Sequence, residues 1–248
     1  MPAITQAIKR ALYARPALAN AVYRAVYALK DYPVHVPGAV TGAAAGAVFD
    51  EYFQDNTWGD PESVSGPGSS WDATAMIRET LPALLSRLRV KTLLDAPCGD
   101  FAWMRDFVEG GAFDYIGGDI VGELVAGLQS GNRPPRARFV QLDICSDPLP
   151  PADLWLSRDC FIHLPNAMIR RALANFHRSG IPWLLISQYD FARENKDIGF
   201  GGFRPVNLRK EPFALPASRD ALFDFHYPYP PRKLALWHRD DIPPALGG

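Results

Sequence analysis

Long apolar runs are missing from this 248-residue sequence. None approaches the ~20 consecutive residues that a helix needs to cross a bilayer, so we expect no membrane span. An excess of positive charge is missing too, since 26 Lys and Arg stand against 27 Asp and Glu. A chain without a basic field has little to hold a nucleic-acid backbone. We therefore expect a soluble, cytoplasmic protein with no nucleic-acid partner.

Cysteine is scarce, and its placement excludes two further classes. Cys98, Cys145 and Cys160 are odd in number and show no paired spacing, which favours reduced thiols over a disulfide framework. Neither a CxxC nor an HxxxH pair occurs, so we predict no metal site. The GxGxxG pyrophosphate fingerprint is also missing, and this argues against a nicotinamide-dependent dehydrogenase.

What the sequence does contain, after about residue 90, is a regular alternation of short apolar runs and helical patterns. This alternation is typical of βαβ units and a parallel sheet. The length suits one α/β domain with an appended segment. We predict strands at 91–96, 115–120, 137–144, 153–157, 182–189 and 233–238. We predict helices at about 72–88, within 100–110, near 122–130 and at about 166–177.

The N-terminal 48 residues differ from the rest and are predicted to form a helical arm and linker ahead of a domain at 49–248. Up to residue 30 every charged residue is basic, and Pro16 suits the first turn of a second helix. We favour an arm that packs on its own domain or on a second copy, which would make a homodimer. A helix lying on an anionic membrane is the less favoured alternative.

Four acids follow four consecutive predicted strands: Asp95, Asp119, Asp143 and Asp159. Open α/β sheets bind ligands at the carboxyl ends of their strands, so all four should border one crevice. A carboxylate can accept hydrogen bonds from both hydroxyls of a ribose, which suits Asp119. Asp143 suits the exocyclic amine of an adenine. The alternative is that each acid only caps the helix that follows it.

These residues resemble the class I S-adenosylmethionine-dependent methyltransferases over roughly Asp95 to Tyr189. The motifs D-x-P-C-G-D-F-x-W (95–103) and R-D-C-x-x-H-L (158–164) mark a bacterial subgroup, together with W-G-x-x-E-S-x-S-G-x-G-S (58–69) and R-P-x-N-L-x-x-x-P-F-x-L-P (204–216). The resemblance implies a Rossmann-like, seven-stranded, mostly parallel sheet with helices on both faces. It also implies S-adenosyl-L-methionine as cofactor, bound by Asp95, Ala96, Pro97, Cys98, Gly99, Trp103, Asp119, Ile120, Asp143, Ile144 and Arg158.

The acceptor side is predicted from three segments. His163 is the candidate general base, with Asp159 four residues earlier to orient it if a helical turn forms there. The aromatic and turn-rich stretch 49–71, here called the lid, is long enough to be functional. The predicted acceptor-binding residues are Trp58, Ser65, Gly66, Ser69, Tyr189, Arg204 and Asn207.

The predicted function is O-methylation of a hydroxyl on a saccharide or small polar metabolite. Two alternatives stay open. One is N-methylation of a small amine, and the other is binding of the donor without catalysis.

Overall fold

The computed structural model describes residues 15–29, 45–224 and 229–243. Its centre is a seven-stranded sheet with the order β3-β2-β1-β4-β5-β7-β6. The first five strands are parallel, and β7 runs antiparallel to both β5 and β6. This confirms the predicted mostly parallel sheet. The strands are β1 (Thr92–Asp95), β2 (Asp114–Asp119), β3 (Ala137–Gln141), β4 (Leu154–Ser157), β5 (Trp183–Gln188), β6 (Asp220–Phe223) and β7 (Lys233–His238).

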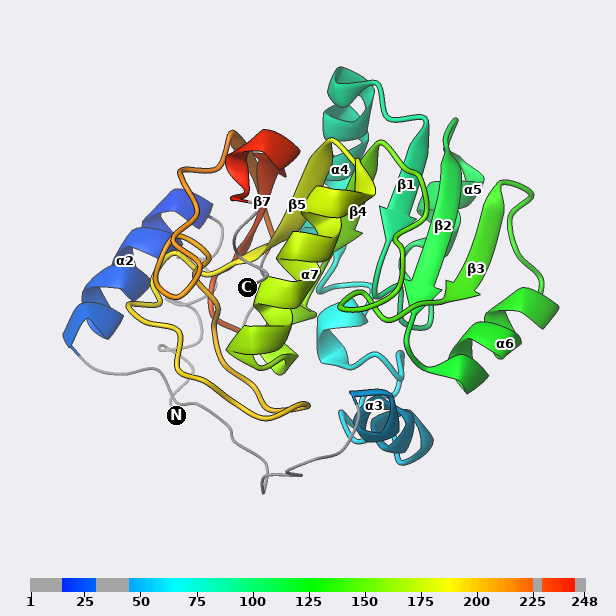
Figure 1. The fold of residues 1–248 in the computed structure, drawn as a ribbon, viewed down its shortest axis with the longest axis horizontal. Helices are drawn as coiled ribbons and strands as arrows, with labels where there is room; N and C mark the ends of the chain where they lie inside the picture. The colour runs from blue at the N-terminus through cyan, green and yellow to red at the C-terminus, as the bar shows by residue number, and fades with distance from the viewer. Residues whose placement is uncertain (1–14, 30–44, 225–228, 244–248) are drawn as a thin grey trace.

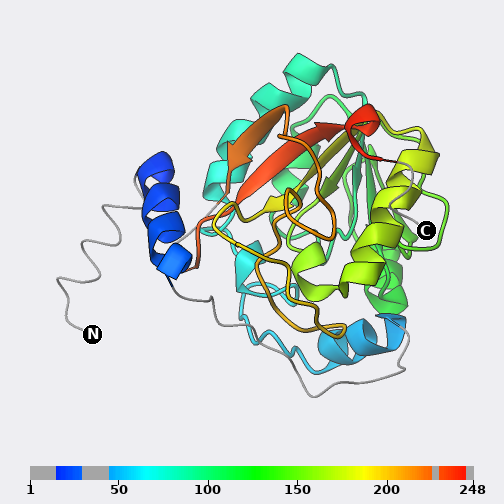
Figure 2. The same cartoon turned by 60° about the vertical axis from the view of Figure 1, so that its left-hand side comes forward.

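Helices cover both faces of this sheet. In Figure 2 the teal helix α4 and the yellow-green helix α7 lie on opposite sides of the strands. The described helices are α2 (Pro16–Leu29), α3 (Ala45–Gln54), α4 (Ala75–Leu88), α5 (Arg105–Glu109), α6 (Gly122–Ser130) and α7 (Asn166–Ser179). None of them is both long and apolar enough to span a membrane.

Two hydrophobic cores result, because successive side chains of a strand point to opposite faces. On β4, Trp155 enters the core that contains α7, whereas Leu154 and Leu156 enter the core that contains α4. Strand β5 alternates in the same way. The central strands are thus buried on both faces, which explains why their sequences read as continuous apolar runs.

One predicted segment near the N-terminal side of the domain is wrong. Residues 45–54, taken as the end of a linker and the start of a loop, form helix α3. The helix predicted within residues 100–110 is α5, which turns precede.

Helix α2 begins at Pro16, as predicted. It packs on its own domain through the buried Ala19 and through Tyr23, whose ring centroid lies 5.9 Å from that of Phe191. The basic residues Lys9, Arg10 and Lys30 of the predicted arm, and the linker from Pro33 onward up to residue 44, lie outside the described residues.

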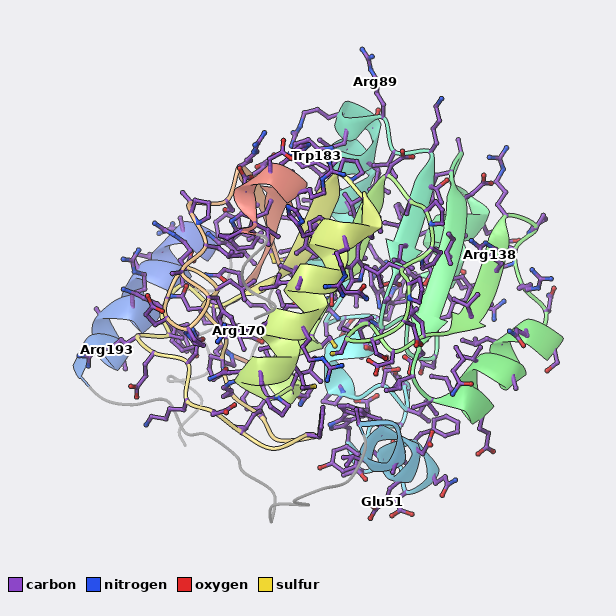
Figure 3. The ribbon with its side chains drawn as sticks, viewed as in Figure 1. Glu51, Arg89, Arg138, Arg170, Trp183 and Arg193 are labelled. Atoms are coloured by element: carbon purple, nitrogen blue, oxygen red, sulfur yellow. The ribbon has the colours of Figure 1, made fainter. Side chains whose placement is uncertain are left out.

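The ends of the strands determine where a ligand can bind. The strand order reverses between β1 and β4, and at such a switch point open α/β sheets leave a crevice outside the carboxyl ends. In Figure 1 the arrowheads of β2 and β3 point toward α3, which lies across that end of the sheet. Glu51 of α3 is exposed and points away from the sheet (Figure 3).

Candidate active site

A cavity of about 320 Å³ lies at the carboxyl ends of β1, β2, β3 and β4. All four predicted acids line it, namely Asp95, Asp119, Asp143 and Asp159. The lid, α3 and two C-terminal segments complete the wall. The volume falls within the roughly 300–1,000 Å³ range of small-molecule sites. The convergence of the acids predicted from their spacing is therefore present in the fold.

Asp119 ends β2 and organises the turn after β1. Its Oδ2 accepts a 3.0 Å hydrogen bond from the amide of Gly99, and its Oδ1 accepts one of 3.1 Å from Val121. Gly99 has φ +53°, a conformation that glycine adopts without strain. Burial raises the pKa of Asp119, although these amides act in the opposite direction. Each oxygen keeps a further lone pair for a ligand hydroxyl.

Asp95 ends β1 and is almost fully buried. Burial raises the pKa of this carboxyl to about 7, even though a hydrogen bond from Tyr115 and the charge of Arg158 act to lower it. Ionising a carboxyl that is buried away from water costs free energy, and a cation close to the carboxylate lowers that cost. Asp95 is therefore suited to receive a positively charged ligand group.

Asp143 follows β3 and shapes the turn there. Its Oδ1 accepts a 2.8 Å hydrogen bond from the amide of Cys145, and its Oδ2 accepts one of 2.8 Å from the Ser146 hydroxyl. Apolar side chains from the same strand ends line the cavity with it, namely Ile120, Leu124, Leu142 and Ile144. A carboxylate among apolar side chains fits a flat, nitrogen-bearing ring better than a strongly charged group.

The lid is fastened to the turn after β1. The Ser63 hydroxyl donates a 2.7 Å hydrogen bond to Oδ2 of Asp100, and the Asp100 amide donates one of 2.9 Å to Oγ of Ser65. A Cβ at Gly99 would lie 2.2 Å from Oγ of Ser65, so only glycine lets the two segments approach this closely. Trp58, Ser65, Gly66 and Ser69 all line the cavity, as predicted.

A buried cluster of four charges forms part of the wall. Arg158 donates to both carboxylate oxygens of Asp224, at 2.8 and 3.2 Å, and to the carbonyl of Gly68 in the lid, at 2.7 Å. Arg232 donates to Asp224 at 3.1 Å and pairs with Asp159 at 3.0 Å. Burial alone would raise the pKa of Asp224, but the two guanidinium groups outweigh it and lower that pKa.

His163 closes a short 3₁₀ turn, η2 (Phe161–His163), and faces the cavity. Its Nδ1 lies 2.7 Å from the carbonyl oxygen of Gly202. A carbonyl can only accept, so Nδ1 carries the proton and Nε2 carries the lone pair. Burial lowers the pKa of His163, which the Gly202 carbonyl partly opposes. A neutral imidazole with a defined tautomer results.

In the structure, Asp159 and His163 have hydrogen-bond partners other than each other. Asp159 has φ +52° and precedes a 3₁₀ turn, so the four-residue offset does not bring the two side chains together on one helical face. Ser187 donates to Asp159 Oδ1 at 3.2 Å, while Arg232 pairs with Oδ2. Asp159 thus belongs to the charge cluster, and Gly202 sets the tautomer of His163.

Three other predicted site residues do not line the cavity. Ala96 is fully buried, and its carbonyl accepts a hydrogen bond from the Trp155 indole. Arg204 is 1% exposed, and it stabilises the η2 turn by donating hydrogen bonds to the carbonyls of Phe161 and Leu164. Asn207 is buried in a network with Gln188 and Asn195. The remaining predicted donor-side residues (Pro97, Cys98, Trp103 and Arg158) and Tyr189 do line the cavity.

The sequence prediction missed several residues of the wall. Arg232 lines the cavity, and its partner Asp224 is fully buried and does not. Neither belongs to a local motif, because they meet only across the β6–β7 pair, where the Asp224 amide donates to the Arg232 carbonyl. The aromatic side chains of α3 and of residues 200–203 were also missed: Phe49, Phe53, Phe200 and Phe203. Within the described ranges, no group of three or more His, Cys, Asp or Glu side chains is placed to hold a metal ion.

Comparisons with known proteins bear on the fold. The sequence matches no known family model and no curated protein. Among solved structures, it is similar to the Burkholderia thailandensis 1,6-didemethyltoxoflavin-N1-methyltransferase, with 18% identity, a TM-score of 0.55, and coverage of 83% of this chain and 94% of that one. It is also similar to human N-acetylserotonin methyltransferase, with 13% identity, a TM-score of 0.54, and coverage of 90% and 68%.

The chain has the class I methyltransferase fold. The first of these structures contains S-adenosylhomocysteine and the second contains S-adenosylmethionine. At such low identity the likeness concerns the fold and does not extend to the acceptor.

Proposed function

We propose that this protein is an S-adenosylmethionine-dependent methyltransferase that methylates a hydroxyl of a small molecule. One observation carries the proposal. The carboxylates at the carboxyl ends of β1, β2 and β3 line the same cavity as a neutral histidine whose Nε2 lone pair is available. The cavity therefore has groups for a donor and a group for an acceptor proton. The two similar methyltransferase structures support the donor assignment.

The donor-side residues fit the parts of S-adenosylmethionine. Asp119 has lone pairs left for the two ribose hydroxyls after binding Gly99 and Val121. Asp143, with Ile120 and Ile144, offers a carboxylate beside apolar side chains for the adenine. Asp95 offers a buried carboxyl for the ammonium of the methionine part. When bound, S-adenosylmethionine supplies a methyl group activated by a positively charged sulfur.

The contribution of this chain to catalysis is alignment, exclusion of water and removal of one proton. The lid covers the cavity and is tied to the donor turn through Asp100 and to the charge cluster through Arg158. Such closure favours a displacement reaction by fixing the reacting groups and keeping water out. His163 accepts the hydroxyl proton at Nε2, because Nδ1 is committed to Gly202.

Two alternatives compete with this proposal. An amine acceptor would use the same donor site, and its neutral form would not depend on a base. A protein that only binds the donor would have the same donor site and no turnover. The alternatives differ in what they predict for an acceptor screen.

The test is a donor-consumption screen with two readouts. The protein is incubated with S-adenosylmethionine and panels of hydroxyl and amine compounds, and both S-adenosylhomocysteine and the methylated product are measured by mass spectrometry. We expect product from hydroxyl compounds. Product from amines alone would favour the N-methylation alternative. Tight binding of S-adenosylhomocysteine with no product across both panels would favour the binding protein.

A further inference from the structure

Aromatic rings form a large part of the cavity wall. They come from two parts of the chain: residues 49–58, which run from α3 into the lid, and residues 200–203 between β5 and β6. Those that face the cavity are Phe49, Phe53, Trp58, Phe200 and Phe203. Two parts of the chain that are distant in sequence thus place rings in one cavity, and one ring from each, Trp58 and Phe203, lies next to His163.

The rings next to His163 form a connected series. The Trp58 ring lies 5.5 Å from Tyr52 and 5.6 Å from His163, and the Phe203 ring lies 6.1 Å from His163. These separations fall within the 4.5–7 Å range of interacting aromatic pairs. The Tyr52 hydroxyl also donates to the carbonyl of Gly201. A Cβ at Gly201 would lie 2.6 Å from that hydroxyl, so α3 and the 200–203 segment are in close contact.

The charged side chains on the acceptor side pair with one another. Arg158 and Arg232 bind Asp224 and Asp159, and these two positive and two negative charges cancel. Ser65 binds Asp100, and Arg204 and Asn207 lie outside the cavity. A saccharide would need hydrogen-bond partners for several hydroxyls, and each one left without a partner on burial costs free energy. The balanced charges also favour an uncharged acceptor.

The basicity of His163 points in the same direction. Burial lowers the pKa of its imidazole, which makes it a weak base. A phenolic hydroxyl has a pKa near 10, whereas that of an aliphatic hydroxyl is nearer that of water, about 15.7. Proton transfer to a weak base is far less unfavourable from the phenol. The weak base and the aromatic wall therefore both favour an acceptor with a phenolic hydroxyl.

We propose that the acceptor is an uncharged aromatic compound whose ring packs on Trp58 and Phe203 and whose phenolic hydroxyl donates to Nε2 of His163. This proposal rests on the proposed methyltransferase function and narrows its substrate class away from saccharides. In the reaction the phenolic oxygen forms a bond to the methyl carbon while the carbon–sulfur bond breaks. The phenolic proton passes to His163, which returns it to water, and the sulfonium leaves as a neutral thioether.

The experiment compares aromatic compounds with saturated partners of the same skeleton. Binding is measured by tryptophan fluorescence and saturation-transfer NMR in the presence of S-adenosylhomocysteine, and methylation is measured by mass spectrometry. The pairs are 1-naphthol with decahydro-1-naphthol and catechol with cyclohexane-1,2-diol, and methyl α-glucoside represents the saccharides. We expect the aromatic member of each pair to bind about tenfold more tightly. Equal binding within both pairs, or tighter binding of the glucoside, overturns the proposal.

Two variants test whether the rings of Trp58 and Phe203 recognise an aromatic acceptor or only stabilise the fold. Trp58→Leu and Phe203→Leu keep apolar bulk and remove the ring, so we expect them to lose most of the aromatic preference while S-adenosylhomocysteine binds as before. Trp71→Ala is the matched control, because Trp71 is 48% exposed and lies outside the cavity wall. Unchanged aromatic preference in both ring variants also overturns the proposal. Failure of S-adenosylhomocysteine to bind the parent would instead overturn the proposed methyltransferase function.

Discussion

The hydroxyl of Tyr115 donates a 2.7 Å hydrogen bond to Oδ2 of Asp95, and this buried pair connects the cavity wall, which Asp95 lines, to the hydrophobic core that contains Tyr115. This bond stabilises the ionised carboxylate, yet burial outweighs it and leaves the pKa of Asp95 at about 7. The charge of Asp95 therefore changes near neutral pH. A positively charged ligand group beside it would favour the ionised form.

Donor binding should depend on pH through Asp95. Below pH 7 the free protein holds a proton on this carboxyl, and binding of the donor ammonium must release it. Affinity should therefore rise with pH up to about 7 and level off above it, with S-adenosylhomocysteine binding about tenfold more weakly at pH 6 than at pH 8. Calorimetry at several pH values measures this. Asp95→Asn should bind weakly at every pH, and Tyr115→Phe should move the midpoint upward. A flat profile for the parent would contradict the assignment.

Replacement of His163 should impair turnover without affecting the donor site. We expect His163→Gln to lower kcat by about 10²- to 10⁴-fold, because the proton acceptor is lost, while the affinity for S-adenosylhomocysteine stays the same. Because burial lowers the pKa of His163, parent kcat should hold down to the ordinary histidine range and fall only at more acid pH. His177→Gln on α7, outside the cavity wall, is the matched control. Equal activity of parent and His163→Gln would exclude a base at this position.

The buried charge cluster should contribute strongly to stability. Asp224→Asn leaves Arg158 and Arg232 without a shared carboxylate, and loss of one partner in a buried ion cluster typically costs about 3–5 kcal/mol. Asp220→Asn is the control in the same β6 segment, since its pair with Arg87 is exposed and worth less than about 1 kcal/mol. Urea unfolding gives both values. Similar free energies of unfolding for the two variants would show that the cluster is not stabilising.

The fastening of the lid should slow release of the bound product. Ser63→Ala removes the hydrogen bond to Asp100, which is worth about 1 kcal/mol, so dissociation of S-adenosylhomocysteine should be about fivefold faster. Stopped-flow tryptophan fluorescence measures that rate. Ser130→Ala on α6, where the hydroxyl binds only carbonyls of its own helix, should leave the rate unchanged. Unchanged dissociation from Ser63→Ala would mean that the lid does not limit release.

The sheet and the donor side could be predicted from the sequence because their signals are local. Apolar runs gave the strands, and acids directly after those runs had to converge once the strands were parallel. Helix α3 was missed because its apolar periodicity extends over only ten residues. In addition, Gly46 lies in its first turn, and turn formers follow it. Short amphipathic segments of this kind depend on tertiary packing, here of Phe49 and Phe53 against the cavity.

The acceptor side was harder to predict because its contacts are long-range. An arginine among turn formers was interpreted as a ligand-binding residue, but Arg204 instead satisfies carbonyls of the η2 turn more than 35 residues earlier in the chain. A histidine four residues after an acid suggested a pair, but the carbonyl of Gly202 supplies the partner. In both cases the residue type indicated a strong hydrogen-bonding group, and only the fold determines which partner it meets.

The most direct test of the central claim is calorimetric titration of S-adenosylhomocysteine into the parent protein, Asp119→Asn and Asp114→Asn. Asp119 and Asp114 lie at opposite ends of β2, and only Asp119 lines the cavity, whereas Asp114 is exposed. We predict that the parent and Asp114→Asn bind with equal affinity and that Asp119→Asn binds at least about tenfold more weakly, through loss of charge-assisted hydrogen bonds. No binding by the parent, or undiminished binding by Asp119→Asn, would contradict the account.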